Sequence, residues 1–237
     1  MQNMTYRPAA RLRVNTKPPA VTLAFIALNV LAFVLDRGLG LIQYGSLDQG
    51  PLTVWGLRYN PAIVLGNQWW RLLTAAFLHG SISHLFFNCM GTYIWGRFVE
   101  SFYGRWRTAA ILIVSAIVGN AAGLAFSNYP ALGFSGAVFG LLGALLAFYR
   151  YDKELFTRIF GLSVLVYAGY SLVSGFISSG VDNWGHMGGL IGGFLIGRAL
   201  GILGQPRRDA TNYLSGVGLL LLVALLIAKG IYWPKFG

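Results

Sequence analysis

The chain has 237 residues, of which 56% are hydrophobic and 11% charged, and its formal net charge is +11. A soluble domain carries about 25% charged residues, so this composition excludes a typical water-soluble globular protein. The basic residues stand in short clusters between apolar runs and do not form one patch, which indicates membrane topology and not nucleic-acid binding. Glycine is frequent, with 32 residues, as is typical of closely packed transmembrane helices.

Apolar segments long enough to cross about 30 Å of hydrocarbon recur along the chain. They predict an all-α, polytopic transmembrane helical bundle with a six-helix core and a seventh, C-terminal transmembrane helix. The predicted helices span residues 19–36, 82–101, 105–127, 134–150, 155–178, 184–203 and 212–232. This pattern divides the chain into a basic N-terminal tail (1–18), the six-helix core (19–203) and a linker with the seventh helix (204–237).

The distribution of Lys and Arg predicts the orientation of the bundle. With the N-terminus in the cytoplasm, 13 of the 18 Lys and Arg residues fall on the cytoplasmic side, which favours this orientation and an outer C-terminus. The apolar run after the basic residues 1–17 is not followed by a convincing cleavage site, so we interpret it as a retained helix. Because no transit peptide is evident, we expect an integral protein of a bacterial plasma membrane.

Residues 37–81 do not fit the helical pattern, and we expect them to form a long outer loop. Loops of more than about 15 residues are usually functional or disordered, and the aromatic residues Trp55, Tyr59, Trp69 and Trp70 argue against disorder. Because Trp and Tyr favour the membrane interface, we expect the loop to lie partly in the outer interface.

Polar side chains inside membrane segments are costly and tend to be functional. The chain has three histidines, His79, His84 and His186, and all of them fall at or near the outer ends of predicted helices. Asn88 lies about one turn after His84 on the same helix face, and Ser135 begins the fourth predicted helix. Helices two, four and six enter from the same side, so we expect these polar residues to lie at a similar depth.

Glycines indicate which of these helices touch. The small faces consist of Gly136, Gly140 and Gly143 on the fourth helix and of Gly189 and Gly193, beside Gly188 and Gly192, on the sixth. Small faces let helix backbones approach closely in lipid. We therefore expect the fourth and sixth helices to pack together and to bring Ser135 close to His186.

A serine beside a histidine base is the minimum arrangement for nucleophilic catalysis. Gly133 and Gly136, which flank Ser135, predict a tight turn and exposed N–H groups at a helix N-terminus, where an oxyanion can be stabilised. His84 and Asn88 are candidate donors to the same charge. Taken singly, each residue has an ordinary explanation in helix packing or interfacial position, but their coincidence at one depth favours a catalytic site.

Several motifs occur in a fixed order: Trp70-Arg71, His79, His84-x-x-x-Asn88, Gly96-x-x-x-Glu100-x-x-x-Gly104, Gly133-x-Ser135-Gly136 and Gly185-His186-x-x-Gly189. This ordered set resembles the rhomboid intramembrane proteases. The resemblance covers roughly residues 19–203, and the seventh helix resembles family members that add one at the C-terminus.

The resemblance implies an intramembrane serine endopeptidase that uses no cofactor and no metal. Ser135 would be the nucleophile and His186 the general base, without a third carboxylate. His84 and Asn88 would stabilise the oxyanion together with the backbone N–H of Ser135, and His79 would support the loop before the second helix. The substrates would be transmembrane segments of other proteins in the lipid bilayer, cut near their outer ends.

The resemblance also implies that Phe139 packs against the His186 ring, and that Gly133, Gly136 and Gly189 support the site. Many family members have Ala in place of Gly185, and some have Tyr in place of Phe139. Neither difference is expected to remove the chemistry.

Asp182, close before His186 in the chain, is expected to lie in a wet outer loop, and we assign it no role. Three alternatives remain at this point. A metalloprotease would need the three histidines as ligands, although no His-Glu-x-x-His motif is present. A channel or transporter would need polar residues along a whole membrane path. A non-catalytic rhomboid-like protein that binds membrane helices would tolerate the loss of Ser135.

Overall fold

The computed structural model describes residues 17–178, 180–204 and 209–232. Most of the predicted basic tail (1–18) and part of the loop before the seventh helix therefore lie outside the described residues. Across the described ranges the regular structure is entirely helical, without a β-strand, which confirms the predicted all-α fold.

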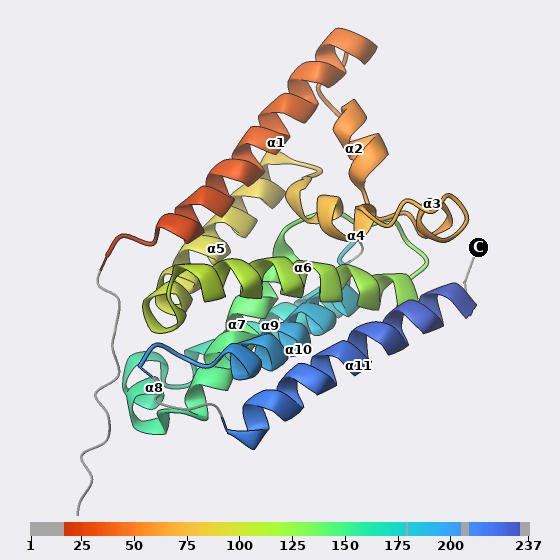
Figure 1. Cartoon of the computed structure of the whole chain (residues 1–237). Coiled ribbons are helices and arrows are strands. Elements are labelled where there is room, and N and C mark those ends of the chain that lie inside the picture. The colour runs from red at the N-terminus through yellow and green to blue at the C-terminus, as the bar shows by residue number, and fades with distance from the viewer. Residues whose placement is uncertain (1–16, 179, 205–208, 233–237) are drawn as a thin grey trace, which may run out of the picture.

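The long helices are α1 (Ala20–Tyr44), α5 (Ile82–Tyr103), α6 (Arg105–Phe126), α7 (Ser135–Tyr149), α9 (Ser163–Ile177), α10 (Asn183–Leu200) and α11 (Ala210–Tyr232). The short ones are α2 (Pro51–Gly56), α3 (Asn60–Val64), α4 (Arg71–Thr74), the 3-10 helix η1 (Ala75–Phe77) and α8 (Lys153–Phe160). Helices α6, α10 and α11 lie side by side, while α1 reaches away from them and α2 to α4 gather at one end of the bundle (Figure 1).

Three of the described helices, α1, α6 and α11, are long and apolar enough to cross a membrane. The number rises to five if each of two bent helix pairs counts as one span. Helix α7 is apolar but has only 15 residues. The seven-span count and the cytoplasmic position of the N-terminus therefore stay predictions.

Helix α7 forms the centre of the bundle, and α10 packs against it through glycines. A Cβ atom on Gly189 would lie 2.0 Å from the carbonyl oxygen of Gly136, and one on Gly193 would lie 2.0 Å from that of Gly140. A side chain of any size at either position would therefore push the two backbones apart. This confirms the predicted packing of the two glycine faces.

Helix α10 has a second glycine face, which packs against α6. A Cβ atom on Gly188 would lie 2.5 Å from the Cβ of Ala122, and one on Gly192 would lie 2.9 Å from the Cβ of Val118. The paired glycines of α10 thus allow close packing against two helices, with α7 on one face and α6 on the other.

The first helix is longer than predicted. It was predicted to end at residue 36, but α1 continues to Tyr44 and is capped by Gly45, which has a positive φ of 66°. The charged residues Asp36 and Arg37 therefore lie inside the helix. The charged side chains of Asp36 and Arg37 are stable here because polar groups of the following loop form hydrogen bonds with them. The buried Asp36 carboxylate accepts hydrogen bonds from the N–H and the hydroxyl of Thr53 at 2.9 and 2.6 Å, and Arg37 donates to the carbonyl oxygen of His79 at 2.8 Å.

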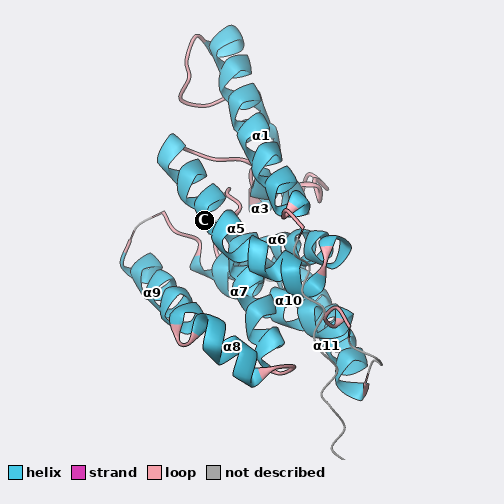
Figure 2. Ribbon diagram, turned by 90° about the vertical axis from the view of Figure 1, so that its left-hand side faces the viewer, coloured by secondary structure: helices cyan, strands magenta, loops and turns pink. Residues whose placement is uncertain are grey.

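The prediction of a single helix over residues 155–178 was wrong. The segment forms α8 and α9, whose axes are bent by 65°. The break falls at Gly161, which adopts a positive φ of 52° that glycine tolerates more readily than other residues. In Figure 2 the pair lies along one edge of the bundle, beside α7.

Candidate active site

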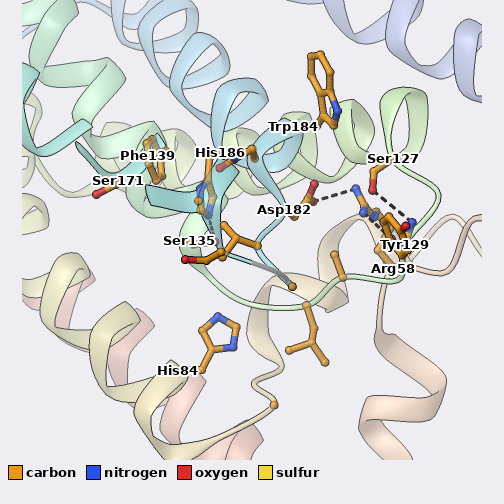
Figure 3. A pocket seen from close by; sticks show the side chains of 18 of the residues that line it. Arg58, His84, Ser127, Tyr129, Ser135, Phe139, Ser171, Asp182, Trp184 and His186 are labelled. Carbon is orange, nitrogen blue, oxygen red and sulfur yellow. Dashed lines mark hydrogen bonds and ion pairs between the residues drawn. The ribbon is translucent and has the colours of Figure 1, made fainter. Parts of the chain in front are cut away.

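The site is built where the N-terminal ends of α7 and α10 meet. Ser135 is the first residue of α7, and His186 lies in the first turn of α10. The Ser135 Oγ lies 2.8 Å from the His186 Nε2, within hydrogen-bond distance (Figure 3). The glycine packing described above brings these two helix ends together, as the sequence predicted.

The imidazole of His186 is held by an aromatic ring. Phe139, one turn after Ser135, stacks on it with ring centroids 4.3 Å apart and an interplanar angle of 14°, which confirms the predicted contact. Across the described ranges, nothing accepts or donates a hydrogen bond at the His186 Nδ1. The ring orientation is therefore fixed by stacking and by the serine.

A tight turn precedes the serine. Gly133 has a φ of 122°, and its N–H donates to the carbonyl oxygen of Ala75 at 2.9 Å. A Cβ atom at this position would lie 2.6 Å from the His84 imidazole. Glycine is therefore required here both for the backbone conformation and for the close approach of His84.

Helix α5 contributes His84 and Asn88 from one face. The Asn88 Nδ2 donates to the carbonyl oxygen of His84 at 2.9 Å, and because an amide carries two N–H donors, one of them is left for another acceptor. The buried His79 lies before the helix, and its ring meets that of His84 edge-on at 5.1 Å.

One cavity of about 1350 Å³ joins these groups. Ser135, His186, His84 and Asn88 all line it, so the structure brings the four predicted polar residues to a common site. Ser171 of α9 lies toward one end of the cavity and Trp184 toward the other (Figure 3).

Two charged residues of this cavity were missed or misplaced by the sequence analysis. Asp182 was expected in a wet loop without a role, but its side chain is only 19% exposed and its Oδ2 lies 3.0 Å from the Nη1 of Arg58. Asp182 also caps α10, because its Oδ1 accepts from the N–H of Gly185 at 3.1 Å. An Asp directly before a helix is a recognisable capping signal, whereas nothing in the sequence indicates the burial of Arg58.

No cluster of three or more His, Cys, Asp or Glu side chains suited to a metal ion occurs within residues 17–178, 180–204 and 209–232.

Comparison with known proteins gives one consistent family. A sequence model of the Rhomboid domain matches residues 66–202. The chain is 39% identical to the rhomboid protease GluP of Bacillus subtilis over 92% of its own length and 42% of that protein. It is 30% identical to the putative rhomboid protease YdcA of the same organism, over 70% of this chain and 86% of the relative.

A third relative, rhomboid-like protease 1 of Toxoplasma gondii, is 32% identical over 75% of this chain and 61% of that protein. The chain thus spans less than two thirds of two of these three relatives.

Proposed function

The chain belongs to the rhomboid family, and on that premise we propose that it is an intramembrane serine endopeptidase whose nucleophile is Ser135. The observation that carries the proposal is the separation of 2.8 Å between the Ser135 Oγ and the His186 Nε2. The two side chains line a cavity at the meeting point of two helix N-termini. A hydroxyl next to an imidazole is the arrangement that activates serine for attack on a carbonyl.

The proposed reaction is acyl transfer in two steps. His186 takes the hydroxyl proton as the Ser135 Oγ bonds to the carbonyl carbon of the substrate, and it returns that proton to the leaving amine as the peptide bond breaks. In the second step His186 takes a proton from a water molecule as the water oxygen bonds to the acyl carbon. It then gives this proton to the Ser135 Oγ as the ester bond breaks, which releases the carboxylic acid product and restores the serine hydroxyl. The cavity has room for that water, which hydrocarbon would not supply.

Three groups converge on the place where the oxyanion would form. The N–H of Ser135 stands at the start of α7, where the first N–H groups have no partner within the helix. His84 approaches the preceding turn closely, and the Asn88 amide keeps one N–H beyond its bond to the His84 carbonyl. Side-chain and backbone donors of this kind stabilise developing charge.

We infer that the site works as a dyad. Asp182, the nearest acid to His186 in the chain, is engaged with Arg58 and with the N–H of Gly185. Phe139 stacks on the His186 imidazole and thereby orients it, so no carboxylate is needed for this role. The proposed roles of Gly133, Gly136 and Gly189 are to permit the tight turn and the close helix contact on which this geometry depends.

The proposed substrates are transmembrane segments of other membrane proteins, cut near their outer ends. The proposed location is a bacterial plasma membrane, with the N-terminus in the cytoplasm and the C-terminus outside. This orientation rests on the distribution of Lys and Arg.

The test is cleavage of a model single-span substrate by the purified protein in lipid. Wild type is expected to cut and Ser135→Ala to be inactive. Ser171→Ala, which removes another hydroxyl from the same cavity and leaves the hydrogen bond between Ser135 and His186 in place, is the matched control and is expected to cut. A fluorophosphonate probe should label wild type and the control, but not Ser135→Ala. Equal cleavage by wild type and Ser135→Ala would refute the assignment of Ser135 as the nucleophile. A wild-type protein that neither cuts the substrate nor reacts with the probe would favour a non-catalytic helix-binding protein.

Asn88→Ala is expected to slow the reaction and not to abolish it. Loss of one oxyanion donor costs about 10²- to 10³-fold in kcat, or about 3 to 4 kcal/mol. The measurement is kcat for the same substrate, with completeness of probe labelling as the check on folding. An unchanged kcat would remove Asn88 from the proposed oxyanion site.

A further inference from the structure

Arg58 is a fully buried charged residue that the proposed chemistry does not use. It lies in the short link between α2 and α3, and its backbone pairs with Ala131 in an isolated antiparallel bridge. The Arg58 N–H donates to the Ala131 oxygen at 2.8 Å, and the Ala131 N–H donates to the Arg58 oxygen at 3.0 Å. Ala131 belongs to the link between α6 and α7, which leads into Ser135. The outer loop is thereby joined to the segment that positions the nucleophile.

The guanidinium of Arg58 extends these backbone contacts to the other catalytic helix. Its Nη2 donates to the carbonyl oxygen of Tyr129 at 2.9 Å, in the same α6–α7 link. Its Nη1 lies 3.0 Å from the Oδ2 of Asp182 (Figure 3). The group lies against bare backbone of α6, because a Cβ atom on Gly123 would come within 1.0 Å of the Nη1.

Asp182 connects the Arg58 side chain to the start of α10. While its Oδ2 faces Arg58, its Oδ1 accepts from the N–H of Gly185 at 3.1 Å. Its backbone oxygen accepts from the N–H of His186 at 3.0 Å. A movement of Asp182 would therefore move the first turn of α10, which carries the histidine.

We propose that Arg58 is a positioning residue for Ser135 and His186, because one guanidinium ties the link before the serine to the cap before the histidine. The planar guanidinium can donate to several acceptors in fixed directions, and a buried charge is stable only while its partners stay in place. This inference rests on the proposed protease function. Arg58 does not touch the reacting atoms, so its effect would be on the distance between the Ser135 Oγ and the His186 Nε2.

Three substitutions test the proposal in the full-length protein in lipid. Arg58→Met keeps much of the side-chain volume and removes the charge. Asp182→Asn keeps a capping oxygen for the N–H of Gly185 and removes the ion pair. Both are expected to lower kcat about 10- to 100-fold, as expected for a displacement of about 1 Å between reacting groups, while KM stays within about threefold of wild type. Arg58→Lys is expected to recover part of the loss, because the positive charge is kept and the directed pair of contacts is not.

The fluorophosphonate probe separates positioning from folding. For Arg58→Met the rate of labelling should fall in parallel with kcat, while the final labelled fraction equals that of wild type. Arg71→Met is the matched control, because it removes another buried arginine from the same loop that has no hydrogen bond to α10 or to the α6–α7 link. Its loss of kcat should be clearly smaller. The double variant Arg58→Met with Asp182→Asn should lose no more than the worse single variant.

The outcomes are distinguishable. If wild type neither cuts nor labels, the proposed function fails and this inference fails with it. If wild type cuts and Arg58→Met retains its kcat, only the inference is overturned. It is also overturned if the loss lies in KM, or if Arg71→Met loses as much kcat. Should Arg58→Met not fold, Asp182→Asn and Arg58→Lys decide the question by the same criteria.

Discussion

Two regions of the protein meet at the site and are held by different means. The α7–α10 interface consists of backbone packed on backbone, with glycines where any side chain would separate the helices. The loop of residues 45–81 consists of short helices whose positions depend on buried charged side chains that bond to carbonyl oxygens and N–H groups. Adding a side chain at the interface is therefore expected to destabilise the packing of α7 on α10. In the loop, removal of a buried hydrogen-bonding side chain is expected to destabilise the short helices.

The largest expected effect comes from adding a methyl group to the interface. In Gly189→Ala the new Cβ would lie 2.0 Å from the Gly136 oxygen, so the two backbones must separate. Overpacking of a core costs about 1–3 kcal/mol and occasionally more, and we expect about 3 kcal/mol or more here because the neighbour is backbone. The measurement is thermal unfolding in detergent.

Gly169→Ala is the control for this experiment. Gly169 lies within α9, and a Cβ atom there would meet nothing within 4 Å. Alanine favours a helix over glycine by about 0.8–1 kcal/mol, so this variant should be at least as stable as wild type. Equal losses of stability in the two variants would contradict this explanation, because the effect would then not come from the contact with α7.

A smaller effect is expected from removing a donor in the loop. Arg71 donates to the Gln68 side chain at 2.7 Å and to the carbonyl oxygens of Val54 and Leu57 at 3.1 and 2.8 Å. Arg71→Met removes these bonds, and because water reaches part of this loop, where Trp70 is 51% exposed, the expected loss is about 1–3 kcal/mol in total. We expect faster limited proteolysis in the link between α3 and α4, which contains Gln68, while the backbone pair of Arg58 with Ala131 keeps the link between α2 and α3 in place.

The structural damage in Arg71→Met is expected to stay local. In Arg71→Met the cleavage rate of α7 and α10 should match that of wild type, because none of the bonds of Arg71 reaches those helices. Proteolysis of the loop at the wild-type rate would show that the arginine does not hold the loop.

The smallest effect on activity is expected from a substitution of Gly185, which lies in the closely packed helix α10 and next to the charged side chain of Asp182. A Cβ atom there would lie 2.5 Å from the Oδ2 of Asp182, which is the far end of a side chain and can rotate. We therefore expect Gly185→Ala to lower kcat by less than about 10-fold, or about 1.4 kcal/mol. The measurement is kcat beside Asp182→Asn. A loss in Gly185→Ala as large as in Asp182→Asn would mean that the carboxylate cannot move.

From the amino-acid sequence alone we predicted the all-α fold, most helices of the core and four of the polar residues that line the cavity, namely Ser135, His186, His84 and Asn88. Hydrophobic composition and apolar run length are local properties, and they already specify a helical membrane bundle. The glycine faces also predicted the contact between α7 and α10, because small residues at helical spacing leave a face on which only another backbone fits.

The positions at which charged residues are buried could not be predicted without the folded structure. The first helix was predicted to end at residue 36, yet α1 continues to Tyr44, and partners from the distant loop satisfy the side chains of Asp36 and Arg37. Likewise, Arg58 and Asp182 meet across the fold although they are far apart in the chain. The free energy of a buried charge depends on partners that only the folded chain brings near, and no local pattern in the sequence contains that information.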